Sequence, residues 1–271
     1  MKGGRYHNLW GSSKLHFLKT LLNTDRATVV ICSDIITAEI TVNEATLFFP
    51  DKKILYFPEY SQEPFEKIRV LPDITSARVD TLDNLDSSQN CLIVSTPYGL
   101  LKKLPSRSVF RSAIKEINIG QELSRDDLLQ YFDISGFINV EVVNAPGEFT
   151  IRGDKLDIFP INYEYPLRIE FFDNIVECIN IYNPETQRTI ERISYARVLP
   201  ATEAITTTKV LKAKVSHLKH IHDEIKLFGK FAGFHWYMPA VYDRFNTLFD
   251  FIESEYNIVL CGDNILDAVK K

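Results

Sequence analysis

The feature that most constrains this chain is a segment with the apolar–polar alternation of a half-buried β-strand, residues 166–172 (PLRIEFF). A period of two puts the aliphatic residues and Phe171 on one face, toward a core, and Arg168, Glu170 and Phe172 on the other. An aromatic ring beside a guanidinium, on a sheet face that is not the core, is typical of a protein-docking hot spot. It is not typical of a catalytic cleft.

The first third of the chain alternates strand and helix patterns. Short apolar runs typical of buried parallel strands occupy residues 28–33 (TVVICS), 53–57 (KILYF) and 90–95 (NCLIVS). Helix patterns cover residues 34–49, 75–85 and 98–104. This alternation predicts an α/β domain in which helices pack on the faces of a parallel sheet.

The pattern changes to α+β near residue 114. Residues 114–119 are typical of a strand, and Ser124 is placed to cap a helix that ends at Gly136. Short strands joined by turn residues then continue to residue 199, which predicts a mainly antiparallel sheet. The last strand pattern, NIVLC before Gly262, resembles those of the first third. We therefore expect it to return to the first sheet, which makes the middle module an insertion. The predicted domains are residues 1–113, 114–199 and 200–271.

The composition argues against several classes of function. A formal net charge of −5 and a pI near 5.7 argue against a broad nucleic-acid footprint. One basic run is predicted to be a solvated connection, with non-specific DNA binding as the alternative: Lys102, Lys103, Arg107, Arg111 and Lys115. The four cysteines are scattered, so we expect no zinc ribbon and no disulfide framework. With no apolar segment of membrane-spanning length, the prediction is a soluble cytoplasmic protein without a membrane partner.

A parallel α/β domain raises the question of a nucleotide site. A phosphate loop needs GxxxxGK[ST], because its backbone amides, lysine and hydroxyl hold the phosphates and Mg²⁺. We expect the corresponding segment at residues 9–16 (LWGSSKLH), where the second glycine and the hydroxyl after Lys14 are missing. Residues 261–264 (CGDN) lack the acidic pair of an active site. The sequence therefore predicts no hydrolysis, no catalytic residue, no cofactor and no metal in this chain.

Several spaced motifs together point to a known family. They are, in order, FTIRGD (149–154), DIFP (157–160), PLRIEFFD (166–173), TQR (186–188) and LPA (199–201), with STPYGLLKKLP and GQELSRDDLLQYFDISGF upstream. This series resembles the domain shared by the excision-repair protein UvrB and the transcription-repair coupling factors (the Mfd family). The resemblance covers nearly the whole chain and is weakest before residue 28 and after residue 203. The tyrosine-rich hairpin of UvrB has no room between residues 56 and 72, which favours the amino-terminal region of the coupling factors.

The resemblance implies a function. In that family this domain is the docking site for UvrA, and the docking residues carry over to Arg152, Arg168 and Phe172, with Glu170 a weaker member. The expected fold is a degenerate P-loop-like, UvrB-like α/β domain with an inserted α+β docking domain. The expected function is recruitment of UvrA in transcription-coupled nucleotide excision repair, by a non-catalytic module. RNA polymerase, DNA and ATP-driven translocation would then belong to the rest of a longer protein.

Three alternatives stay open at this point. Arg168 and Glu170 can also form a cross-strand ion pair, with Phe172 capping a satellite cluster. The chain can also be a UvrB-like nucleotide-dependent enzyme that processes damaged DNA. His217 and His220 can share a helix face, whereas His222 points elsewhere, so we expect a solvated helix surface rather than a metal site. The aromatic run 231–237 (FAGFHWY) is expected to anchor the last segment onto the first sheet.

Overall fold

The structure is a computed structural model of the 271-residue chain. It describes residues 6, 9, 11–21, 26–63, 65–85, 90–215, 223, 230–262 and 265. The chain forms two compact units. The first comprises residues 1–59, 81–102 and 251–271, and the second residues 60–80 and 103–250.

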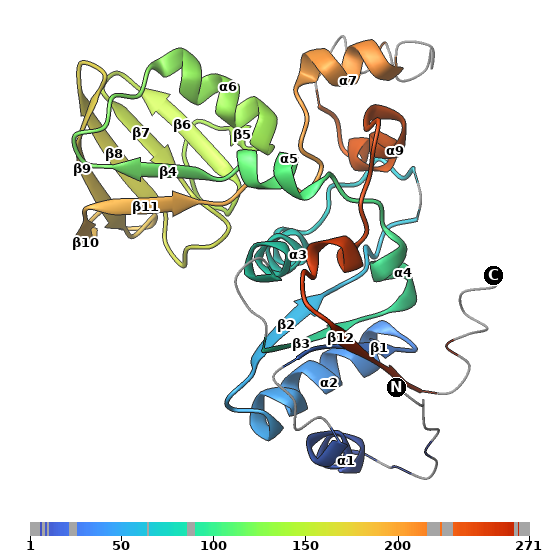
Figure 1. Ribbon diagram of the computed structural model, residues 1–271. Coiled ribbons are helices and arrows are strands. Elements are labelled where there is room, and N and C mark those ends of the chain that lie inside the picture. Colours follow the sequence, from blue (N-terminus) through green and yellow to red (C-terminus); the bar gives the residue numbers. More distant parts are fainter. Residues whose placement is uncertain are drawn as a thin grey trace. The chain divides into compact units, whose positions relative to one another are not determined.

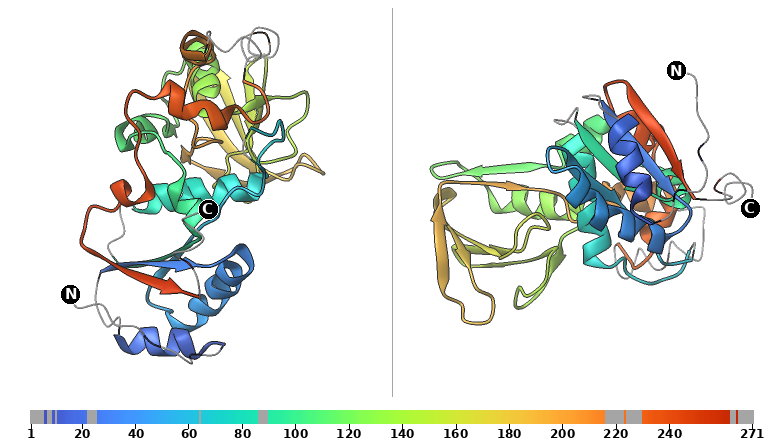
Figure 2. Two further views of the ribbon diagram at one scale, coloured as in Figure 1. Left: turned by 90° about the vertical axis from the view of Figure 1, so that its right-hand side faces the viewer. Right: turned by 90° about the horizontal axis from the view of Figure 1, so that it is seen from below.

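The first unit is built on a four-stranded parallel sheet (Figure 1). Its strands are β1 (Ala27–Cys32), β2 (Lys53–Phe57), β3 (Cys91–Ser95) and β12 (Tyr256–Cys261), in the order β12-β1-β3-β2. All three pairings are parallel, and β12 lies beside β1 over its full length (Figure 2). The last strand of the chain therefore completes the sheet that the first strands begin.

Helices of this unit are α1 (Ser13–Leu21), α2 (Ile35–Phe48) and α4 (Pro97–Leu101). Helix α2 packs against β1, β2 and β3, and α1 packs against α2. The core between them contains Leu15, Val30, Ala38 and Leu92, all fully buried. A further helix, α3 (Pro72–Leu85), belongs to the second unit up to residue 80 and to the first from residue 81.

The second unit contains a six-stranded sheet in the order β10-β9-β8-β7-β6-β5. The strands are β5 (Ile138–Asn139), β6 (Glu148–Arg152), β7 (Lys155–Ile158), β8 (Leu167–Phe172), β9 (Ile175–Tyr182) and β10 (Thr189–Ile193). All pairings are antiparallel except that of β5 with β6. The predicted fold class, a parallel α/β sheet domain with an inserted, mainly antiparallel α+β domain, is confirmed.

One helix and a pair of strands complete this domain. Helix α6 (Arg125–Ser135) contributes Phe132 to the core, where its ring stacks on Phe149 of β6 at 4.0 Å. Strands β4 (Lys115–Asn118) and β11 (Tyr195–Val198) pair antiparallel, so the chain runs into and out of the domain along neighbouring strands.

The ends of α6 follow the sequence signals. The Ser124 side chain accepts a hydrogen bond from the Asp127 amide, and Gly136 ends the helix in the left-handed region with φ 79°. A Cβ at Gly136 would come within 2.4 Å of the Thr202 side chain. Glycine is therefore required here for two independent reasons, its backbone conformation and the close approach of Thr202.

The remaining elements of the second unit are short: α5 (Arg107–Ser112), α7 (Thr208–Val215), η1 (Phe234–Tyr237) and α9 (Met238–Val241); η2 (Leu248–Phe251) ends at the boundary between the units. The prediction for the aromatic run was wrong. His235 and Trp236 pack against the Tyr60 ring, at 4.8 Å and 6.0 Å between ring centroids, and Tyr237 packs against Phe65. Their partners are thus residues between β2 and α3, rather than the first sheet.

A buried ion pair lies next to these rings. Arg78 of α3 is fully buried, and its Nε lies 2.7 Å from Oε2 of Glu203. The Tyr60 hydroxyl donates to the other carboxylate oxygen at 2.6 Å, and the guanidinium lies 4.8 Å from the Tyr60 ring centroid. These contacts join Glu203, which follows the inserted domain, to Tyr60 before α3 and to Arg78 within α3, all in the second unit.

Some predictions concern residues outside the described part of the chain, namely His217, His220, His222, Asp263 and Asn264. Among the described residues, no cluster of His, Cys, Asp and Glu has the arrangement of a metal site. None of the helices in the described ranges is both long and apolar enough to cross a membrane.

Candidate partner-docking site

Strand β8 presents its alternating residues as the sequence predicts. Leu167 and Ile169 are fully buried in the core, and Phe171 packs against the same core. Arg168 is partly exposed, and Phe172 is 69% exposed at the end of the strand. Strand β9 carries one extra residue opposite the Glu170–Phe171 step, yet the alternation of β8 continues through it. The predicted face therefore exists, with its ring open to solvent.

The pairing registers arrange this outer face in rungs that cross the strands. One rung runs from Arg152 through Lys155 and Glu170 to Cys178, and the next from Thr150 through Asp157 and Arg168 to Asn180. Phe172 pairs with Ile175, which is 47% exposed, at the end of the β8–β9 hairpin. The sheet thus places the four predicted docking residues, Arg152, Arg168, Glu170 and Phe172, on one surface.

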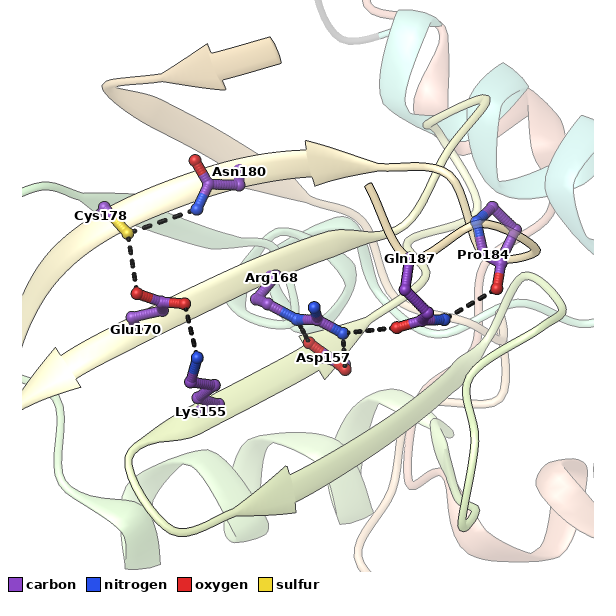
Figure 3. Close-up of polar contacts among 8 residues, drawn as sticks. All are labelled: Lys155, Asp157, Arg168, Glu170, Cys178, Asn180, Pro184 and Gln187. Carbon is purple, nitrogen blue, oxygen red and sulfur yellow. Dashed lines mark hydrogen bonds and ion pairs between the residues drawn. The ribbon is translucent and has the colours of Figure 1, made fainter. Parts of the chain in front are cut away.

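Arg168 is held by groups that the sequence reasoning did not identify. Its Nε and Nη2 donate to the two carboxylate oxygens of Asp157 at 2.7 and 2.8 Å, and Nη2 also donates to Gln187 at 2.8 Å (Figure 3). Donating hydrogen bonds to Asp157 raises the pKa of the guanidinium. Its carbon lies 4.4 Å from the centroid of the Tyr182 ring, in cation–π contact. Burial raises the pKa of Tyr182 to about 12.

This geometry changes how Arg168 can meet a partner. Asp157 occupies the Nε–Nη2 edge, so that edge is closed to a partner carboxylate. Neither Asp157 nor Gln187 accepts a hydrogen bond from Nη1, and Tyr182 also forms a hydrogen bond with the guanidinium. Gln187 is itself fixed, because its Nε2 donates to the Pro184 carbonyl at 2.7 Å. Arg168 is therefore a preorganised cation rather than a mobile one.

Glu170 belongs to a second polar group on the same face. It pairs with Lys155 at 2.9 Å, and this hydrogen bond lowers the pKa of the Glu170 carboxyl. The Cys178 thiol donates to its other oxygen at 3.5 Å, and Asn180 donates to that sulfur at 3.4 Å (Figure 3). The proposed Arg168–Glu170 ion pair is thus replaced by two separate pairs, each with a residue of β7.

Arg152 lies at the exposed end of β6. Its guanidinium donates to the Glu141 carbonyl. Together with Lys155 and Arg168 it gives these two rungs three cations against the carboxylates of Asp157 and Glu170. Cations and an exposed ring on one face favour a partner surface with an acidic patch and an apolar pocket.

The expected position of the nucleotide loop was wrong. In a parallel sheet this loop joins the first strand to the following helix, and here that connection is Ser33–Asp34, between β1 and α2. The segment around Lys14 instead leads into α1. The Asp34 carboxylate caps α2 by accepting from the Thr37 amide at 2.8 Å and the Thr37 hydroxyl at 2.9 Å. A fixed negative charge therefore occupies the helix N-terminus where a phosphate would bind.

The comparisons with known proteins identify the domain that carries this face. Residues 116–203, which extend from within β4 to beyond β11, match the family described as the UvrB interaction domain. This part of the second unit is therefore similar to that domain.

Proteins similar over a larger part of the chain are transcription-repair-coupling factors. That of Bacillus subtilis is 29% identical over 73% of this chain, and that of Escherichia coli is 26% identical over 79%. The UvrABC system protein B of Chlorobium phaeobacteroides is 27% identical over 78% of the chain. The resemblance to the UvrB and coupling-factor family is confirmed. The chain spans only 17% and 20% of the two coupling factors and 33% of the UvrB protein.

Proposed function

We propose that this chain is the UvrA-docking module of a transcription-repair coupling factor and acts in transcription-coupled nucleotide excision repair. The observation that carries the proposal is the outer face of β8 within a domain that matches the UvrB interaction family. On that face an exposed ring, Phe172, follows a fixed cation, Arg168, along one strand. The named relatives act in DNA repair, which is consistent with this role.

In this proposal the four face residues have different roles. Phe172 inserts its ring into an apolar pocket of UvrA, and Arg168 meets an acidic group through Nη1. Arg152 adds positive charge at the end of β6. Glu170 acts mainly by holding Lys155 in place, so its loss weakens binding less. The docking domain corresponds to residues 114–199, flanked by a degenerate UvrB-like domain at 1–113 and a returning segment at 200–271.

We further propose that the docking module is itself non-catalytic. The support is the Asp34 carboxylate at the N-terminus of α2, which repels a phosphate from the position that a P-loop provides. ATP-driven translocation, DNA and RNA polymerase then involve other parts of a longer cytoplasmic protein. The length of the relatives supports this division.

The test is a pull-down and a titration with purified UvrA. Replacing Phe172 or Arg168 with alanine should lower the affinity by roughly 30-fold or more, the effect of a hot-spot residue of about 2 kcal/mol. Tyr98→Ala is the matched control, because this ring is 58% exposed in the first unit and lies outside the proposed face. Undiminished binding by both face variants would exclude this site.

The alternative, a UvrB-like nucleotide-dependent enzyme, gives a different result. It predicts ATP turnover by the chain, or a rise in melting temperature on addition of ATP and Mg²⁺. The docking proposal predicts neither, in the wild-type chain and in Phe172→Ala alike.

A further inference from the structure

Two cysteines from opposite ends of the chain lie side by side in the first unit. Cys32 ends β1 and Cys261 ends β12, and the two are direct partners in the parallel register. Neighbouring strands are about 4.8 Å apart, within the Cα separation that a disulfide spans. Both residues belong to the cluster under α2, where Cys32 is fully buried and Cys261 is partly exposed. A small molecule can therefore reach Cys261 first.

The surroundings of Cys261 favour its thiolate. The Cys32 thiol donates a hydrogen bond to it, and the Lys14 ammonium of α1 both hydrogen-bonds to it and lies close by as a positive charge. These contacts lower the pKa of Cys261 to about 6, against burial and the nearby Glu44 carboxylate. The pKa of Cys32 is raised by its bond to Cys261 and by burial.

Thr41 of α2 lies between Lys14 and Cys32. Its hydroxyl oxygen accepts from Lys14 Nζ at 3.3 Å and lies 3.6 Å from the Cys32 sulfur. That hydroxyl in turn donates to the Thr37 carbonyl at 2.7 Å. Lysine, hydroxyl and two thiols thus form one connected group on β1, β12, α1 and α2.

We propose that Cys261 and Cys32 form a reactive thiol pair whose ligand class is the small-molecule disulfide. The Cys261 thiolate attacks one sulfur of the disulfide RSSR, forms a mixed disulfide and releases one thiolate RS⁻. The Cys32 thiol then loses its proton and attacks Cys261 Sγ, which releases the second RS⁻. Both leaving thiolates take up protons, so two protein thiols are oxidised and one small disulfide is reduced to two thiols.

The other two cysteines have no such arrangement. Burial raises the pKa of Cys91 and of Cys178, so each remains a thiol at neutral pH. A disulfide between Cys32 and Cys261 ties the last strand of the first unit covalently to the first.

The experiment treats the folded chain with oxidised glutathione and analyses it by mass spectrometry without reduction. The expected product has lost two hydrogens and yields a cross-linked peptide pair containing Cys32 and Cys261. Cys32→Ser should stop at a glutathione adduct on Cys261, and Cys261→Ser should leave Cys32 unmodified. Cys91→Ser and Cys178→Ser are matched controls that should behave as wild type. A wild-type chain with two separate adducts, or with none, would overturn the proposal.

A rate measurement tests the role of Lys14 separately. At neutral pH, iodoacetamide should alkylate Cys261 about tenfold faster than Cys91 or Cys178. Lys14→Met should remove most of this advantage, whereas Lys14→Arg should retain it because the positive charge stays. Circular dichroism of each variant confirms that it is folded. Equal rates at all cysteines of the folded wild type would contradict the assignment.

Discussion

The buried Arg78–Glu203 pair makes the sharpest stability prediction. Arg78 has no exposed side-chain surface and Glu203 only 4%. Hydrogen bonds from Nε at 2.7 Å and from Nη2 at 3.2 Å join them. Replacing Glu203 with glutamine keeps the shape but removes the negative charge that faces the buried guanidinium. Breaking a buried pair on one side typically costs about 3–5 kcal/mol.

The double variant distinguishes the free-energy cost of burying one charge of the pair from the cost of the lost contacts. In Arg78→Met with Glu203→Leu no charge remains buried, so the main penalty of each single variant disappears. The Tyr60 hydroxyl also loses its hydrogen bond to Glu203 at 2.6 Å, and such a loss costs about 1–3 kcal/mol. We therefore expect the double variant to be more stable than Glu203→Gln alone.

Urea denaturation followed by tryptophan fluorescence measures these differences. Trp236 is a local probe, because its ring lies 6.0 Å from that of Tyr60 in the same unit. Trp10→Phe removes the other tryptophan of the chain. A cost below about 1 kcal/mol for Glu203→Gln would refute the reasoning, as would costs of Arg78→Met alone and Glu203→Leu alone that simply add in the double variant.

Three further predictions follow from the docking domain and the first sheet. Asp157→Asn should lower affinity for UvrA by about tenfold in a titration, because Arg168 loses the carboxylate that fixes it; unchanged affinity would show that the pair does not position Arg168. Phe132→Ala should cost about 3–5 kcal/mol of unfolding free energy in urea, since the ring is 1% exposed and stacks on Phe149, and a cost near zero would exclude this packing. Hydrogen bonds from Ser33 and Thr37 lower the pKa of Asp34 in the folded chain. Its stabilising effect is therefore present above the ordinary aspartate pKa and is lost as the pH falls through the lowered value. Melting curves from pH 7 to pH 3 should show Asp34→Asn less stable at pH 7 and the difference shrinking in acid; a constant difference would contradict this linkage.

Much of the fold could be predicted because its signals are local. Strand β2 has the bounds predicted from the apolar run 53–57. Ser124 and Gly136 lie at the two ends of α6, as expected. The alternation in β8 gave the correct outer face, because a period of two survives the extra residue in β9. Each of these features depends on residues that lie within a few positions of one another along the chain.

The supporting groups of the site could not be predicted, because they depend on register between strands. Asp157 meets Arg168 only once β7 and β8 pair in one particular register. Gln187 reaches the same guanidinium through a turn in which its φ is 58°, a conformation that sequence pattern does not specify. The same holds for Cys32 and Cys261, which pair only after β12 returns to β1.

The position that a nucleotide loop takes in a sheet of this topology was missed for a different reason. The search followed the glycine and lysine of residues 11–14, whereas the strand-to-helix connection after β1 contains neither residue type. Because this connection has the position of a P-loop without its residues, a motif search cannot find it. The capping carboxylate of Asp34 is visible only in the folded chain.

Hydroxyl-radical footprinting of the chain in complex with UvrA tests most directly whether the outer face of β8 is covered by its partner. Oxidation of Phe172, a ring 69% exposed in the free chain, should fall steeply at saturating UvrA. Oxidation of Tyr98, 58% exposed in the first unit, should stay constant. If Phe172 is oxidised at the same rate in the free and the bound chain, UvrA does not dock on this face.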